Sequence, residues 1–262
     1  MYGSVGWTGW IELMPREQWE VYAEVLRRSS SLGIPFALGG NLASATHTGR
    51  WRKTNDMDIY VEPKDRERLM SVLDSLQLRD IQAEYPYDPQ AIYRATNGDA
   101  IVELIWAMQN QRAVVDREWI ERTEQVDLEG LTVRLTAPEE IVWAKLYVIN
   151  RNRCDWPDLL NLIYYCGAGM DWKHLLGRLG ADAPLLSGAL ALLSWLAPSQ
   201  LREVPGWVLK ELSVAVPAED PGPEVLRWRA SLLDRQEWFG SQDIAAAVPQ
   251  NNKPKFRENR PC

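Results

Sequence analysis

The sequence has few metal-ligating thiol and imidazole groups and no long apolar segment. Its 262 residues include only two histidines and three cysteines, which have no repeated short spacing: Cys154, Cys166 and Cys262. These numbers exclude a zinc cluster and favour a reducing, cytoplasmic location. Met1–Trp10 has neither a basic start nor an apolar run, so we expect no signal peptide. The most apolar segment, Leu185–Leu196, is shorter than the roughly 20 residues that span a bilayer, so we expect no membrane partner.

Basic charge is also scarce. The formal net charge is −7, which opposes a protein that coats nucleic acid by bulk electrostatics. Any contact with phosphate groups must therefore be local. Hydrophobic residues make up 46% of the chain and charged residues 25%, which is typical of a globular protein with a buried core.

The hydrophobic pattern predicts an α+β fold, with a mixed sheet and flanking helices followed by a helical C-terminal region. Helical spacing predicts helices over residues 15–32, 42–48 and 64–76; strand patterns cover 34–38, 56–61, 91–96 and 100–106, and a hairpin covers 125–135. Thr136–Glu139 has the pattern of a capping box before a helix that runs to about residue 150. We expect domains over 1–136 and 137–249, and a basic, mobile tail over 250–262.

Two carboxylates are crowded on one face of the strand predicted over residues 56–61. Asp56 and Asp58 flank one residue, so their side chains leave the same face with Cα atoms about 6.8 Å apart. A divalent cation between them, Mg²⁺ or Mn²⁺, would relieve their repulsion. Glu103 lies in an apolar strand where a glutamate needs a partner, so it is a candidate third ligand. The alternatives are a solvated strand edge for the aspartates and an exposed position for Glu103.

A glycine-rich turn precedes these carboxylates. Gly39 and Gly40 stand between a predicted strand and a predicted helix, where backbone N–H groups approach an anion closely. Asn41 adds an amide, and the helix N-terminus favours negative charge. The phosphates of a nucleotide would fit at this turn. The alternative is an ordinary structural turn.

The order of these motifs resembles the signature of the DNA polymerase β-type nucleotidyltransferases. The resemblance rests on Gly39-Gly40-Asn41, then Asp56-Met57-Asp58, then Val102-Glu103-Leu104. It implies a catalytic domain over 1–136, with Asp56, Asp58 and Glu103 binding two divalent metals and a nucleoside triphosphate (NTP). Asn41 stands where the family usually has serine or threonine, and Glu103 stands where aspartate is more frequent.

A second resemblance lies downstream. Lys145 and the segment from Arg151 to Asp158 resemble the Lys…Arg…Lys-Asp-x-x-Asp pattern of the abortive-infection and toxin-type (AbiEii-like) nucleotidyltransferases. It implies that Lys145 lies near the nucleotide and that Asp155 or Asp158 lies near the attacking hydroxyl. The alternatives are a lysine that reaches the surface and two aspartates that cap a helix.

A basic loop separates the glycine turn from the aspartates. Arg50, Arg52 and Lys53 either neutralise a triphosphate or belong to an ordinary solvated loop. We therefore expect a magnesium-dependent nucleotidyltransferase that transfers NMP from an NTP such as ATP to a hydroxyl of an RNA end such as tRNA, of a protein side chain or of a small molecule. The alternative function is a catalytically silent nucleotide-binding or partner-binding module on the same fold, which the departures at Asn41 and Glu103 motivate.

Overall fold

A computed structural model describes residues 6–151, 153–219, 221–233 and 238–239. Seven strands lie within these residues: β1 (Phe36–Leu38), β2 (Asp56–Val61), β3 (Arg79–Asp80), β4 (Ile92–Thr96), β5 (Ile101–Ile105), β6 (Glu124–Leu128) and β7 (Leu131–Leu135). They form one sheet in the order β3-β4-β5-β2-β1-β7-β6. β2 pairs with β5 and β1 pairs with β7 in parallel, and the other pairs are antiparallel. The sheet is therefore mixed, as the sequence predicts.

Helices cover the sheet and continue beyond it. The first group is η1 (Gly9–Leu13, a 3-10 helix), α1 (Arg16–Ser31), α2 (Gly40–Thr48), α3 (Arg66–Ser75) and α4 (Arg117–Glu121). The second group follows the last strand and comprises α5 (Pro138–Leu146), α6 (Trp156–Cys166), α7 (Trp172–Leu179), η2 (Gly180–Asp182, a 3-10 helix), α8 (Ala183–Leu196), α9 (Pro198–Leu201), α10 (Gly206–Glu211) and α11 (Pro223–Leu233). The expected α+β class, a mixed sheet with flanking helices and a helical C-terminal region, is confirmed.

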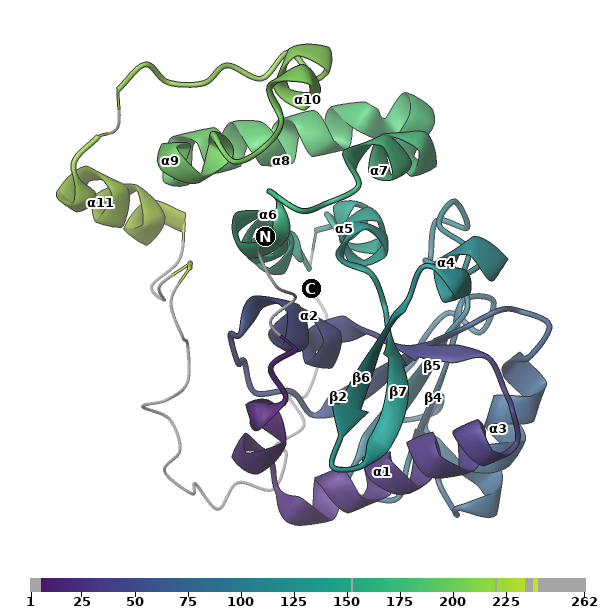
Figure 1. The fold of residues 1–262 in the computed structure, drawn as a ribbon. Coiled ribbons are helices and arrows are strands. Elements are labelled where there is room, and N and C mark those ends of the chain that lie inside the picture. The colour runs from purple at the N-terminus through teal and green to yellow at the C-terminus, as the bar shows by residue number, and fades with distance from the viewer. Residues whose placement is uncertain (1–5, 152, 220, 234–237, 240–262) are drawn as a thin grey trace, which may run out of the picture.

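The helices lie on both sides of the sheet, and α2 of the first group shares its side with the second group. Figure 1 shows α1 and α3 along one side, whereas α2, α5 and α6 lie on the other side, with α7 to α10 stacked beyond them. The strands match this arrangement, because Met57 and Ile59 of β2 and Val102 and Leu104 of β5 are fully buried. The intervening residues of both strands face the α2 and α5 side, which places Asp58 and Glu103 there.

The predicted capping box is wrong. Helix α5 begins at Pro138 after Ala137, and no side chain caps it. The reason is that Thr136, directly after β7, continues the pairing with β1: its N–H donates to the carbonyl of Leu38 at 2.9 Å. Glu139 accepts a hydrogen bond from the backbone N–H of Asp171 instead. The helix also ends at Leu146, earlier than the expected residue 150.

The apolar part of the helical region is longer than the sequence prediction of Leu185–Leu196. Trp172–Leu196 forms a helical stretch of 25 residues with a mean hydropathy of 1.4 in its most apolar window, of which 33% is buried. Length and composition alone would let such a stretch cross a membrane, but core helices of soluble proteins pass the same test. Here the stretch is interrupted by η2, where Gly180 has a φ of +50°. The prediction for residues 250–262 lies outside the described residues.

Candidate active site

The glycine turn brings the start of α2 against the carboxylate of Asp58. The N–H of Gly39 donates to the backbone carbonyl of Asp58 at 2.9 Å. Gly40 has a φ of +55°, and a Cβ atom at this position would lie 1.6 Å from Oδ2 of Asp58. A Cβ atom at Gly39 would lie 2.2 Å from the ring of Tyr60. Both positions therefore require glycine, because any side chain would displace the residues of β2 that lie beneath the turn.

The sheet register brings the three predicted carboxylates to one face. Asp58 lies directly opposite Glu103 on the neighbouring parallel strand β5. Asp56 lies two residues before Asp58 on β2 and faces the same way. The Thr54 hydroxyl donates to Oδ1 of Asp56 at 2.5 Å. Two segments that are distant in the sequence thus supply one acidic cluster beside the glycine turn.

Glu103 has a cationic partner that the sequence analysis did not identify. Arg94 lies opposite Glu103 on the antiparallel strand β4, and its Nε atom is 2.5 Å from Oε1 of Glu103. The Arg94 guanidinium also lies over the ring of Tyr87, 5.9 Å from the ring centroid. Burial raises the pKa of Glu103, and the charge of Arg94 offsets part of that effect. Within the described residues, no group of three or more acidic, histidine or cysteine side chains is arranged to hold a metal ion.

Asp56 and Asp58 differ from Glu103 because they form no ion pair within the described part of the chain. Burial, together with the neighbouring carboxylates of Asp56 and Glu103, raises the pKa of Asp58 well above its ordinary value. The carboxylate form is thus costly without a cation beside it. Hard oxygen ligands on one face, next to a turn suited to phosphates, fit a divalent ion such as Mg²⁺.

Lys145 reaches the same region from α5. Its Nζ atom is 3.2 Å from Oδ2 of Asp155 and 3.1 Å from Oδ2 of Asp158. Arg153 forms a bidentate pair with Asp155, with two contacts of 2.8 Å. Burial alone would lower the pKa of Lys145, but Asp158 and Asp155 outweigh burial and raise it. Lys145 is therefore a buried, paired ammonium group, which excludes the alternative of a side chain that extends to the surface.

The two aspartates do not act as simple helix caps. Asp155 occupies the position before α6, but its side chain makes no capping hydrogen bond. Asp158 lies in the first turn of α6, and its Oδ2 atom also accepts from Arg52 at 3.0 Å. Burial would raise the pKa of both carboxyl groups, but the charge of Lys145 outweighs burial and lowers both values. Both aspartates are therefore ionised at neutral pH and hold cationic side chains in place.

A cleft of about 230 Å³ connects these groups. Its charged side chains come from the strands, from α5 and from the segment between α5 and α6: Asp58, Arg94, Glu103, Lys145, Arg153 and Asp155. Much of the remaining wall is apolar or aromatic and includes Tyr87, Met108, Tyr147 and Val148. A charged floor with an apolar wall is typical of a site that fixes one reactive group and encloses the rest of a small ligand.

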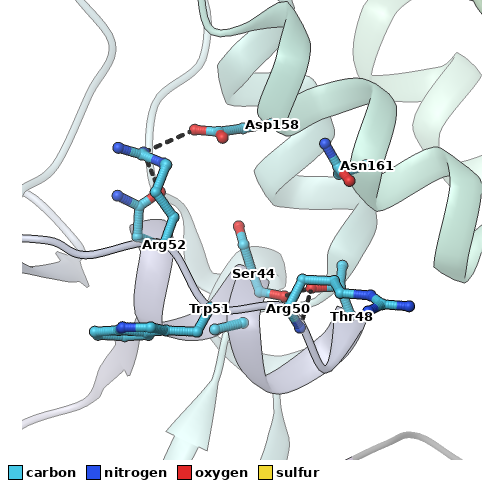
Figure 2. Close-up of a pocket in the computed structure, with 9 residues that line it drawn as sticks. Ser44, Thr48, Arg50, Trp51, Arg52, Asp158 and Asn161 are labelled. Atoms are coloured by element: carbon cyan, nitrogen blue, oxygen red, sulfur yellow. Dashed lines mark hydrogen bonds and ion pairs between the residues drawn. The ribbon is translucent and has the colours of Figure 1, made fainter. Parts of the chain in front are cut away.

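A second, smaller pocket of about 50 Å³ lies beside α2 and α6 (Figure 2). Figure 2 shows Arg52 pointing between α2 and α6, where it contacts Asp158. Arg52 also donates to Oδ1 of Asn41 at 2.6 Å. Arg50 lies over the ring of Tyr165, 5.0 Å from the centroid. Because Asp158 contacts both Arg52 and Lys145, this pocket adjoins the larger cleft.

The predicted site residues thus divide by location into those of the larger cleft, those of the smaller pocket and one that lines neither. The larger cleft contains Gly40, Asp58, Glu103, Lys145 and Asp155, with Gly39 and Asp56 directly beside Asp58. The smaller pocket contains Asn41, Arg52 and Asp158, and its Asn41 amide contacts Thr54 and Arg52. Lys53 is exposed and lines neither pocket. Arg94 and Tyr87 were not among the predicted site residues, although antiparallel pairing of the strands predicted over 91–96 and 100–106 brings Arg94 opposite Glu103.

Comparisons with known proteins give likenesses of fold. No protein-family model and no curated protein matches the sequence. The structure is similar to that of the antibiotic-resistance factor ANT(2'')-Ia, with 19% identity over 69% of this chain and 94% of that chain, and a TM-score of 0.42. It is also similar to the lincosamide antibiotic adenylyltransferase LnuA, bound to lincomycin, with 12% identity over 55% and 95% and a TM-score of 0.41. A candidate nucleotidyltransferase from Helicobacter pylori is 15% identical over 83% and 96%, with a TM-score of 0.41.

Proposed function

We propose that the chain is a cytoplasmic, metal-dependent nucleotidyltransferase that transfers NMP from an NTP to an acceptor hydroxyl and releases pyrophosphate. One observation carries the proposal. Asp58 lies against Gly40 at the start of α2, and it faces Glu103 in register across β2 and β5. A carboxylate cluster that directly adjoins an anion-binding turn is suited to a metal–triphosphate complex. The carboxylates need the positive charge of the metal ion, and the turn needs the negative charge of the phosphates.

In this proposal the residues of the site mainly position the nucleotide and the divalent ion and neutralise the charge of the phosphates. The backbone N–H groups of Gly40 and Asn41, at the start of α2, bind phosphate oxygens, and glycine allows the phosphates to approach closely. Asp56 and Asp58 hold the divalent ion, which supplies charge neutralisation for the phosphates when it is bound. Lys145 offers a buried positive charge beside the same cleft. This division of work is typical of phosphoryl-type transfer, in which catalysis depends largely on position and electrostatics.

Asp155 and Asp158 have a positioning role in this proposal. Their lowered pKa values make them weak bases, whereas their contacts with Lys145 fix the ammonium group in the cleft. The arrangement supports the resemblance to the abortive-infection and toxin-type group, in which a lysine lies near the nucleotide. The acceptor remains a hydroxyl of an RNA end, a protein side chain or a small molecule, and the apolar wall of the cleft is compatible with each.

A label-transfer assay tests the function directly. The purified chain is incubated with each of the four α-labelled NTPs and Mg²⁺, separately with total RNA, with cell protein and with small hydroxylated compounds. We expect label transfer to one acceptor class, no transfer in excess EDTA and no transfer by Asp58→Asn. Asp99→Asn is the matched control, because Asp99 is exposed in the β4–β5 turn. Transfer that survives in Asp58→Asn would overturn the proposal.

A catalytically silent nucleotide-binding module is the second candidate. The observation that favours it is the ion pair of Arg94 with Glu103, which engages the third carboxylate. Calorimetry with each NTP and Mg²⁺ separates the two functions when it is combined with label transfer. Binding without any labelled product supports the silent module, and neither binding nor transfer overturns both candidates.

A further inference from the structure

Three neighbouring strands carry an ordered row of charges on the cleft face of the sheet. Arg94 on β4 lies opposite Glu103 on β5, and Glu103 lies opposite Asp58 on β2. The order across the sheet is therefore positive, negative, negative. The central carboxylate is shared between two environments, because it faces a guanidinium on one side and another carboxylate on the other.

The positive end of this row is held firmly. The side chain of Arg94 is 21% exposed and that of Glu103 is 11% exposed, so the pair is largely shielded from water. The contact of 2.5 Å and the ring of Tyr87 fix the guanidinium from two directions. A shielded ion pair resists separation, because loss of one partner leaves a buried charge uncompensated.

Among the described residues, the remaining two carboxylates have no such partner. Thr54 supplies a neutral hydroxyl to Asp56, and neither Asp56 nor Asp58 forms an ion pair within the described residues. The charge deficit of the cluster therefore lies at these two side chains. Lys145 and Arg153 also act on Asp58, but they are themselves paired with Asp155 and Asp158. One divalent ion at Asp56 and Asp58, together with Arg94, therefore balances the three carboxylates.

We propose that Arg94 is a positioning residue that keeps Glu103 neutralised, so that the nucleotide-bound site takes a single divalent cation at Asp56 and Asp58. The inference rests on the proposed function and departs from the two-ion site that the sequence resemblance implies. Glu103 has a structural partner in place of a second ion, and a second ion would have to displace a shielded guanidinium.

Counting bound Mn²⁺ tests this inference without measuring activity. Full-length protein is mixed with a non-hydrolysable NTP analogue at equal concentration, and bound Mn²⁺ per chain is obtained from the electron paramagnetic resonance signal of the free ion. We expect one bound ion in the wild-type protein and two in Arg94→Gln, with spin coupling between them. The matched variants are Arg94→Lys, which keeps the positive charge, and Arg94→Gln/Glu103→Gln, which removes the released carboxylate. Both should bind one ion.

Each result is decisive. Two ions in the wild-type protein overturn the inference and leave the proposed function intact. One ion in a folded Arg94→Gln variant overturns the role of Arg94. The wild-type count stands on its own if Arg94→Gln does not fold. If the wild-type protein binds no Mn²⁺–nucleotide complex at all, both the proposed function and the inference fail, so the two failures are distinguishable.

Discussion

Removing the charge of Asp58 should make the metal-free protein more stable. Asp56 and Asp58 lie on one face of β2 with Cα atoms about 6.8 Å apart, so their repulsion is about 2.4 kcal/mol at an effective dielectric constant of 20. Attraction from Lys145 and Arg153 offsets part of this cost, since both charges act to lower the pKa of Asp58. Asp58→Asn keeps the shape of the side chain. We therefore expect it to raise the free energy of unfolding by about 1–2 kcal/mol.

Thermal and urea unfolding at pH 7 in EDTA would measure this change. A gain of this size corresponds to a rise in Tm of about 2–8 °C for a chain of this length. Asp99→Asn is the control, and its free energy of unfolding should stay within about 0.5 kcal/mol of the wild-type value. Added Mg²⁺ should then stabilise the wild-type protein and the control but have little effect on Asp58→Asn.

The opposite result would refute the reasoning. If Asp58→Asn is no more stable than the wild-type protein in EDTA, the two carboxylates do not repel each other strongly. The motive for placing a cation between them then disappears. A stabilised variant that still transfers nucleotide would refute the functional assignment alone, because the crowding would exist without serving catalysis.

Other predictions concern residues away from the carboxylates. Glu140→Ala should lower the free energy of unfolding in urea by about 3–5 kcal/mol. Glu140 is fully buried, and its carboxylate contacts an arginine of α7 at 3.1 Å and a histidine of α7 at 2.6 Å. A loss below about 1 kcal/mol would contradict this. Burial lowers the pKa of His47, so the unfolded chain binds its proton first and stability falls as the pH drops below 6.5, by at most about 1.4 kcal/mol per pH unit. Urea titrations from pH 7 to 5 should show a weaker slope in His47→Gln, and equal slopes would argue against the effect. Iodoacetamide at pH 8 should label exposed Cys154 but not Cys166, whose pKa burial raises to about 12; peptide mapping that finds equal labelling would disprove this.

The sequence predicts much of the site where the relevant geometry is local. Alternation along residues 56–61 places Asp56 and Asp58 on one face, and the structure agrees. The two glycines at the start of α2 allow a close approach, and the space beside Gly40 is filled by Asp58. Both features depend on residues that are close in the chain or on backbone conformations that few residue types adopt.

Features that depend on distant pairing are harder to predict. Arg94 is one of many arginines in the sequence, and only the antiparallel register of β4 and β5 makes it the partner of Glu103. Lys145 meets Asp155 and Asp158 because the chain turns back after α5 ends at Leu146, and an irregular connection has no periodicity from which to predict this. Strand β3 is also hard to predict, because its two residues are too few to show an alternating pattern.

The position of β5 between β4 and β2 implies that the proposed nucleotide site is completed late in folding. Its pairing with β4 closes a short hairpin, whereas its parallel pairing with β2 requires an intervening helix and two strands to be in place. Non-local pairings of this kind form late, because the entropy of closing a long loop is lost before the contacts are gained. A refolding chain should therefore recover native circular dichroism before it recovers affinity for nucleotide, and the delay would report the docking of one strand.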